Sequence, residues 1–206
     1  MKNLFALSIL AASVAMTACS KKPEETTPAT GAAATTASAS GATIIKIGHA
    51  APLTGPQAHL GKDNENGVRL AVDELNAKGL TIGGQKVQFE LHSEDDQADP
   101  RIATTVAQKF VDDKVNVMIG HLNSGTTIPA SRIYNDAGIV EISPSATNPK
   151  YTQQGYKGAF RVMANDVQQG KVLGEFAVKE MAAKNIAIID DRSAYGQGLA
   201  KKKKKA

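Results

Sequence analysis

Apolar residues follow two alternating patterns from Thr43 onward. Short runs rich in Val, Ile and Phe are typical of strands, and apolar residues three or four positions apart are typical of helices. The runs typical of strands cover 43–48, 87–91, 115–119, 139–142, 160–162 and 186–189. The helical spacings cover 63–77, a segment from 99 onward, 126–137 and 166–183, and a further helix opens at 195–200. Strands that alternate with helices predict an α/β fold, with a parallel sheet covered by helices on both faces.

The helix from residue 99 has the clearest start signal. Asp99 stands where its side chain can accept hydrogen bonds from the amides of the first turn, and Pro100 takes the first helical position. Ile102, Val106 and Phe110 then follow at intervals of four residues. This spacing predicts one buried stripe along the helix.

The first 42 residues lack this pattern and predict an export signal followed by a tether. Residues 1–18 combine the positive Lys2 with the apolar stretch Leu4–Met16, which is shorter than the ~20 residues that span a bilayer. Cys19 follows small residues, as in the lipid-attachment motif of bacterial lipoproteins; an ordinary signal peptide with an incidental cysteine is the alternative. Residues 19–42, rich in Ala, Thr, Ser and Pro, would then form a lipid-anchored tether.

The formal net charge of +4 does not indicate a basic partner. Lys2 and Lys201–Lys205 carry six of the positive charges, and without these six the charge of +4 becomes −2. Aromatic residues make up only 4% of the chain, so the stacking residues typical of nucleic-acid binding are scarce. We therefore expect no nucleic-acid partner.

Residues 201–206 are a lysine tail that interrupts the helix opening at 195–200. Five consecutive lysines repel one another and bury no apolar surface. We interpret the tail as non-native, the product of a frameshifted or artificially ended reading frame. A functional basic tail is the alternative.

Candidate binding residues follow from a rule for open α/β sheets, whose ligands lie beyond the carboxyl ends of the strands. The rule selects the loops at 52–61, 121–127, 144–149 and 190–196, and two of these loops are rich in hydroxyl residues.

The first of these two loops runs directly into a helix at Ser124. The amides of Gly125, Thr126 and Thr127 would lie at the positive end of that helix, where a carboxylate binds favourably. The alternative is that Ser124 only caps its own helix, which is a common role for serine.

The second loop, 143–149, contains two prolines and three hydroxyl residues. The carbonyl of Ser145 and the hydroxyl of Thr147 could accept hydrogen bonds from an ammonium group. The alternative is a turn in which these side chains satisfy their own backbone. Together, the two loops could hold the two ends of an amino acid.

The sequence contains no signature of catalysis or of a metal or cofactor site. No G-x-S-x-G elbow or G-x-G-x-x-G turn occurs, and the four histidines lack the H-E-x-x-H spacing. Acidic residues cluster at 94–99 without the glycine and spacing of a calcium loop, so we interpret them as a solvated strand end and a helix cap. We predict a binding protein that is not an enzyme, with no cofactor and no metal.

Several segments in fixed order carry a resemblance to a known family: 77–79, 95–100, 119–124, 129–131, 142–149, 168–170 and 186–199. Together they resemble the leucine/isoleucine/valine-binding proteins of bacterial ABC importers, over about residues 45–200. The resemblance implies a type I periplasmic-binding fold, in which two α/β lobes close on a ligand. Residues 43–160 would form the first lobe and residues 161–200 the start of the second.

The resemblance also implies a function and a set of site residues. The chain would capture branched-chain or related amino acids in the periplasm or cell envelope, anchored through Cys19, and deliver them to a permease in the inner membrane. Ser124 and Gly125 would bind the ligand carboxylate. The segment Ser145–Ala146–Thr147 would bind the α-amino group through the Ser145 carbonyl and the Thr147 hydroxyl, and Tyr195 would contribute from the second lobe.

Three departures from the family qualify this expectation. The two cysteines of the family's disulfide fall at Ala98 and Asn123, and Leu60 stands where the relatives have an aromatic residue against the ligand side chain. The family's acidic partner for the ligand ammonium lies beyond residue 206. The preferred ligand therefore stays open, and a ligand-sensing domain of the same fold, for amides or other small amino-acid-like molecules, is the alternative to an importer component.

Overall fold

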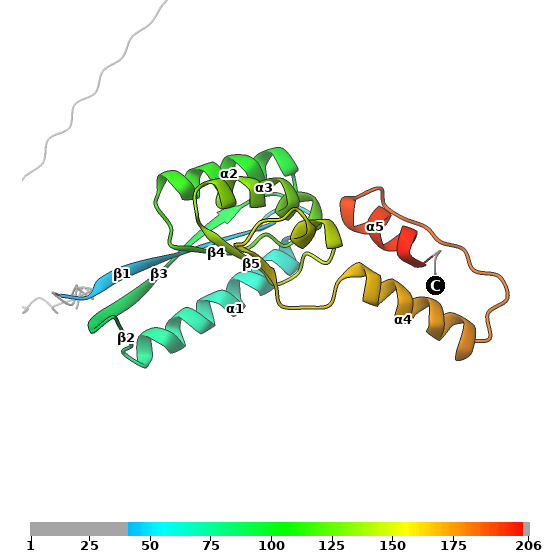
Figure 1. The fold of residues 1–206 in the computed structure, drawn as a ribbon, viewed down its shortest axis with the longest axis horizontal. Coiled ribbons are helices and arrows are strands. Elements are labelled where there is room, and N and C mark those ends of the chain that lie inside the picture. Colours follow the sequence, from blue (N-terminus) through cyan, green and yellow to red (C-terminus); the bar gives the residue numbers. More distant parts are fainter. Residues whose placement is uncertain (1–40, 204–206) are drawn as a thin grey trace, which may run out of the picture. The chain divides into compact units, whose positions relative to one another are not determined.

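A computed structural model describes residues 41–203 of the chain (Figure 1). The predicted signal peptide, Cys19 and all of the tether but its last two residues lie outside the described residues, as do residues 204–206. Among the residues that the structure describes, none of the helices has the length and apolar character needed to cross a membrane.

The strands form one six-stranded sheet in the order β2-β3-β1-β4-β5-β6. Their bounds are Thr43–Ala51 for β1, Thr81–Ile82 for β2, Gln85–Asp95 for β3, Val117–Gly120 for β4, Val140–Ser143 for β5 and Ala159–Arg161 for β6. β1 pairs in parallel with both β3 and β4, and the parallel pairing continues through β5 to β6. The short β2 pairs antiparallel with β3 and forms a hairpin that the sequence pattern did not predict.

Helices cover both faces of this sheet, which confirms the predicted fold class (Figure 1). They span Ala58–Ala77 for α1, Pro100–Asp112 for α2, Ser124–Asp136 for α3, Asp166–Lys179 for α4 and Ala194–Lys203 for α5, with a 3-10 helix, η1, at Pro149–Gln153. α1 packs on β1 and β3, whereas α2 and α3 lie together on the opposite face.

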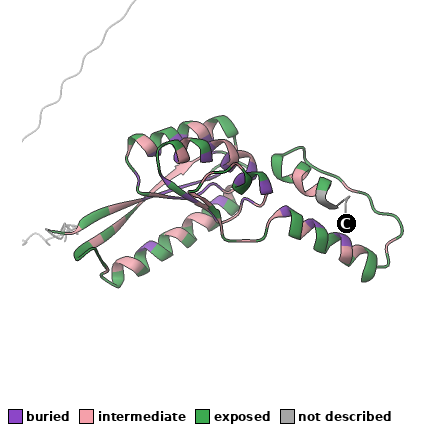
Figure 2. Cartoon of the chain, viewed as in Figure 1, coloured by how far each residue is buried: buried purple, intermediate pink, exposed green. Residues whose placement is uncertain are grey.

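The core lies between the sheet and the pair α2–α3, where Figure 2 shows buried residues concentrated. Phe110, Met118 and Tyr134 are fully buried there. The predicted start of α2 is confirmed, because the Asp99 carboxylate accepts hydrogen bonds from the amides of Arg101 at 2.7 Å and Ile102 at 3.3 Å. These bonds satisfy two amides that the helix itself leaves unpaired.

One predicted strand is wrong. Residues 186–189 adopt no strand, and Ile189 is 93% exposed. A strand requires a neighbour with which to exchange backbone hydrogen bonds, and no strand in residues 41–203 pairs with this segment. Apolar residues alone therefore do not make this segment a strand.

The predicted boundaries of two elements are also corrected. α1 begins at Ala58 rather than at Asp63, since the turn at Gly55 already supplies a carbonyl to the Ala58 amide at 3.1 Å. β3 continues beyond residue 91 to Asp95, so that polar residues form its last part. This extension brings Asp95 and Asp96 to the carboxyl edge of the sheet.

Candidate ligand-binding site

A cavity of about 720 Å³ lies beyond the carboxyl ends of β3, β1, β4 and β5. Of the residues predicted to bind a ligand, Ser124, Gly125, Ser145, Thr147 and Tyr195 line it. The remaining predicted residue, Ala146, is only 1% exposed and does not line the cavity. The structure thus brings together residues from two adjacent strand ends and from the start of α5.

Ser124 is the first residue of α3 and does not cap that helix, so the interpretation of Ser124 as a helix cap is wrong. Asn123 occupies the cap position, and its carbonyl accepts hydrogen bonds from the amides of Thr126 and Thr127 at 3.1 and 2.9 Å. These two amides are therefore not available to a ligand, contrary to the sequence-based expectation. The amides of Ser124 and Gly125 precede the helical hydrogen-bonding pattern and lie at the positive end of the helix dipole.

The loop after β5 is organised by Ser143. The Ser143 hydroxyl accepts hydrogen bonds from the amides of Ala146 at 2.9 Å and Ser145 at 3.3 Å. The turn considered as an alternative is therefore present. The side chains of Ser145 and Thr147 nevertheless take no part in it, and Ser145 instead donates its hydroxyl to Asn64 of α1 at 3.0 Å.

Arg161 of β6 hydrogen-bonds to the same loop. Its guanidinium donates to the carbonyls of Ala146 at 2.6 Å and Asn148 at 2.9 Å, and to the hydroxyl of Thr152 at 2.9 Å. The guanidinium carbon also lies 5.4 Å from the centre of the Tyr151 ring, a cation–π contact. Burial lowers the pKa of Arg161. The rigid, forked donor set of arginine fits two neighbouring carbonyls.

The start of α5 closes the cavity on a further side. The Asn148 side-chain amide donates to the carbonyl of Ala194 at 2.8 Å, which ties α5 to the loop after β5. Tyr195 is 39% exposed, and its hydroxyl lies 3.4 Å from the side-chain amide of Gln169. The Asp191 carboxylate accepts from the Ser193 amide at 2.9 Å, and hydrogen bonds from Ser193 lower the pKa of Asp191.

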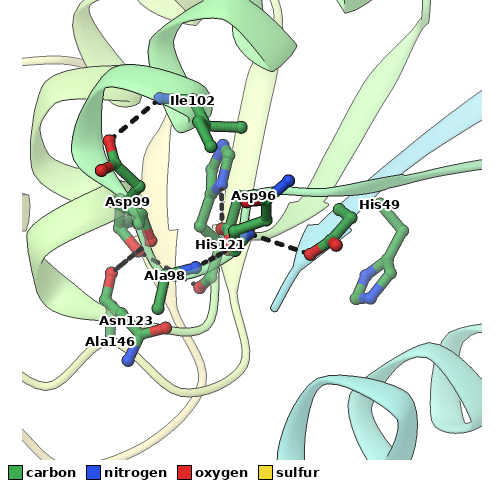
Figure 3. Close-up of polar contacts among 12 residues, drawn as sticks. His49, Asp96, Ala98, Asp99, Ile102, His121, Asn123 and Ala146 are labelled. Atoms are coloured by element: carbon green, nitrogen blue, oxygen red, sulfur yellow. Dashed lines mark hydrogen bonds and ion pairs between the residues drawn. The ribbon is translucent and has the colours of Figure 1, made fainter. Parts of the chain in front are cut away.

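Within the acidic cluster, the interpretation as a solvated strand end is wrong for Asp96. Asp96 is fully buried, and its carboxylate contacts the His121 ring at 2.7 Å (Figure 3). Asp95 accepts from the amide of Leu53 at 2.7 Å and from the hydroxyl of Thr54. Although its partial burial acts to raise the pKa of Asp95, these hydrogen bonds together lower it. Asp99 has the predicted role of a helix cap.

The apolar part of the cavity wall comes from Leu60, Ala98, Pro100 and Leu122. Beside them, the Asn123 side chain donates to the Gln57 side-chain oxygen at 2.7 Å, and the Asn123 side-chain oxygen is buried without a hydrogen-bond partner among residues 41–203. The residues that the structure describes contain no group of three or more His, Cys, Asp or Glu side chains that could hold a metal ion. The lining residues offer a ligand hydrogen-bonding groups, the positive end of the α3 dipole and apolar contact.

Comparisons with known proteins show which family the chain is similar to. A family model described as periplasmic binding protein matches residues 44–206. The Leu/Ile/Val-binding protein homolog 1 of Brucella abortus is 44% identical over 161 residues, which cover 78% of this chain and 43% of that protein. The leucine-specific-binding protein of Salmonella typhimurium is 42% identical over 157 residues, or 76% of this chain and 42% of that protein. The chain thus spans less than half the length of these curated relatives.

Solved structures show the same similarity. The branched-chain amino-acid transporter substrate-binding protein LivJ of Streptococcus pneumoniae, solved with isoleucine, has a TM-score of 0.73 at 33% identity and is similar over 79% of this chain and 46% of its own. A leucine-binding protein, LivK, of Thermotoga maritima has a TM-score of 0.69 at 28% identity, over 76% of this chain and 43% of its own.

Proposed function

The chain belongs to the periplasmic binding protein family, and on that premise we propose that it is the extracytoplasmic binding component of an ABC importer for branched-chain or related amino acids. The observation that carries this proposal is the position of Ser124 and Thr147. They stand at the ends of the neighbouring strands β4 and β5 and line one cavity. The two strand ends are thus close enough to hold the two charged groups of one α-amino acid.

The proposed ligand pose follows from charge. The carboxylate would lie against the amides of Ser124 and Gly125, where unpaired N–H groups and the helix dipole both favour an anion. The ammonium would lie against the carbonyl of Ser145 and the hydroxyl of Thr147. Tyr195 would approach from the α5 side.

The ligand side chain would contact the apolar wall formed by Leu60, Ala98, Pro100 and Leu122. An aliphatic side chain suits such a wall, because burial contributes about 0.8 kcal/mol per CH₂ group. The names of similar proteins and solved structures, which mention leucine, isoleucine and valine, support the same ligand class.

Location and partners are part of the proposal. The apolar segment before Cys19 supports export, and Cys19 would carry the lipid anchor that holds the protein at the cell envelope. The partner would be an ABC permease in the inner membrane.

One observation favours a second candidate, a sensing domain for amides. The Gln57–Asn123 pair places side-chain amides at the cavity wall, and amide groups of a ligand can hydrogen-bond to them. Genes for a permease and an ATPase beside this gene would favour transport, whereas a neighbouring signalling gene would favour the sensor.

Calorimetry with a ligand panel tests the proposal. Apolar residues of α4, such as Val172 and Phe176, are exposed in this chain. Because exposed apolar surface promotes aggregation, the titration uses a chimera as well as the 206-residue chain. The chimera joins residues 44–200 to the remaining part of the Brucella abortus relative. We expect heat with leucine, isoleucine or valine and little with acetamide or urea. Heat with the amides alone supports the sensor, and heat with no ligand contradicts both functions.

A further inference from the structure

We propose that His121 is a positioning residue of the ligand site, which holds three strand-end loops in one arrangement without touching the ligand itself. The inference deepens the proposed function and rests on it. His121 is fully buried and does not line the cavity, yet it directly precedes Leu122, Asn123 and Ser124, which do. Its ring and its carbonyl are bonded in three directions.

The first direction leads to the loop between β3 and α2 (Figure 3). His121 Nδ1 lies 2.7 Å from one carboxylate oxygen of the fully buried Asp96. The other carboxylate oxygen accepts a hydrogen bond from the amide of Ala98 at 2.9 Å. Ala98 lines the cavity and has a positive φ of 56°, a conformation that L residues rarely adopt. The Asp96 carboxylate therefore couples the cavity wall at Ala98 to the His121 ring.

The second direction leads into helix α3. His121 Nε2 lies 3.1 Å from the hydroxyl of Tyr134, which is fully buried. The two rings are 6.0 Å apart between centres and tilted by 33°. Tyr134 belongs to α3, whose first residues are Ser124 and Gly125. The contact therefore joins that helix to His121, which directly follows β4.

The third direction leads to the loop after β5. The carbonyl of His121 accepts hydrogen bonds from the hydroxyls of Ser143 at 2.7 Å and Thr127 at 3.2 Å. Ser143 in turn accepts from the amide of Ala146. The backbone of the Ser145–Thr147 segment is thus linked through Ser143 to the residue whose side chain meets Asp96.

A fully paired network in a buried setting favours one arrangement of the groups it joins, because breaking any member leaves another buried polar group unpaired. Binding is stronger when the site does not need to be ordered by the ligand. The network would therefore act on affinity through the geometry of the loops. A purely structural role would affect only global stability.

Two variants with a matched control separate these roles. Tyr134→Phe removes one hydroxyl from the network, and Asp96→Asn removes the charge that faces His121. Ser131→Ala is the control, because Ser131 lies in the same helix as Tyr134, is also buried, and its hydroxyl bonds to Ile128 at 2.8 Å and to Gln154 at 2.9 Å rather than to Asp96, His121 or Tyr134.

The first measurement is amide hydrogen exchange of Ala146 and Asn148 in the ligand-free chimera, corrected for global stability. We expect Tyr134→Phe and Asp96→Asn to increase exchange at both amides by about tenfold or more, since these amides bond to Ser143 and Ser124, and the control to leave it unchanged. If Asp96→Asn fails to fold, Tyr134→Phe decides alone. Exchange no faster than in the control overturns the inference.

The second measurement is the Kd of the amino acid found for the unaltered chimera. We expect the affinity to fall about tenfold in both variants, with unchanged stoichiometry, and to stay the same in the control. An equal Kd in all three proteins overturns the inference. If the unaltered chimera binds no amino acid, the proposed function fails, while the exchange measurement still decides whether His121 positions the loops.

Discussion

The hydroxyl of Ser124 accepts a hydrogen bond from the backbone amide of Asn148 at 3.2 Å. Ser124 begins α3, and Asn148 belongs to the loop that follows β5. The two segments that would bind the carboxylate and the ammonium of a ligand are therefore in direct contact. A change at either segment is expected to affect the other.

Ser124→Ala is predicted to weaken amino-acid binding by about tenfold or more, because it removes a hydroxyl that can donate to the ligand carboxylate and that also accepts the hydrogen bond from Asn148. The control is Ser131→Ala in the same helix. Ser131 is equally buried, with 2% of its surface exposed, and its hydroxyl accepts a hydrogen bond from Gln154 at 2.9 Å. Neither Ser131 nor Gln154 lines the cavity. Each variant is expected to lose about 1 kcal/mol of stability. Calorimetry and thermal melts of both check the prediction, and equal affinities would contradict it.

Gly61→Ala is predicted to disturb the cavity wall through α1. A Cβ atom at Gly61 would lie 2.0 Å from the carbonyl oxygen of Pro52, so the helix must move away from the loop after β1. We expect a loss of about 1–3 kcal/mol of stability and weaker binding, since Gln57 and Leu60 move with the helix.

Gly67→Ala is the matched control for this change. Gly67 lies in the same helix, and its Cβ would meet no atom within 4 Å. Alanine is expected to stabilise the helix by about 0.5–1 kcal/mol there, because glycine loses more backbone entropy on folding. Urea unfolding of both variants gives the comparison, and a destabilised Gly67→Ala or an unaffected Gly61→Ala contradicts the packing described.

Glu141 makes the stability of the protein depend on pH. Burial raises the pKa of its carboxyl well above 4.5, so the folded state holds a proton that the unfolded state releases. The contribution of Glu141 to stability is therefore largest below the unfolded pKa and is lost as pH rises toward the raised folded pKa, by up to about 1.4 kcal/mol per pH unit.

Glu141→Gln is predicted to remove this loss. Its free energy of unfolding should exceed that of the unaltered protein by an amount that grows as pH rises above about 4.5. Urea unfolding of both proteins from pH 4 to pH 8 measures the difference. Parallel stability profiles would show that the Glu141 carboxyl does not titrate as its burial requires.

Arg161→Lys is predicted to loosen the loop that contains Ser145 and Thr147. A lysine ammonium cannot reproduce the forked contacts to the carbonyls of Ala146 and Asn148. We expect binding to weaken by about tenfold, and hydrogen exchange at the loop amides to rise. Arg132→Lys is the control, since Arg132 is 76% exposed on α3. Equal effects of both changes would contradict the proposed role of Arg161 in holding this loop.

The sequence predicted those features that depend on neighbouring residues. Asp99 and Pro100 define the start of α2, because a helix cap involves only residues within four positions of one another. The two hydroxyl-rich loops were placed at one edge of the sheet because parallel strands end at the same edge. The periodicity also predicted both helical layers, although α1 starts earlier than its apolar stripe indicated.

Features that depend on distant residues were missed or misread. The sequence pattern predicts a solvated acid at Asp96, because nothing near it in sequence shows that His121 will lie 2.7 Å away. Arg161 gave no signal, since its two carbonyl partners belong to a loop 13 to 15 residues earlier. Residues 186–189 are apolar enough for a strand, but strand formation depends on a neighbour that periodicity does not report.

The central claim is that the two strand-end loops bind the two charged ends of one amino acid. Titration of the chimera with L-leucine, 4-methylpentanoate and leucinamide tests it most directly, because the second compound lacks the ammonium and the third lacks the carboxylate. We predict that L-leucine binds at least about a hundredfold more tightly than either analogue, and that Ser124→Ala narrows the gap to leucinamide. Equal affinities for all three compounds would contradict the account.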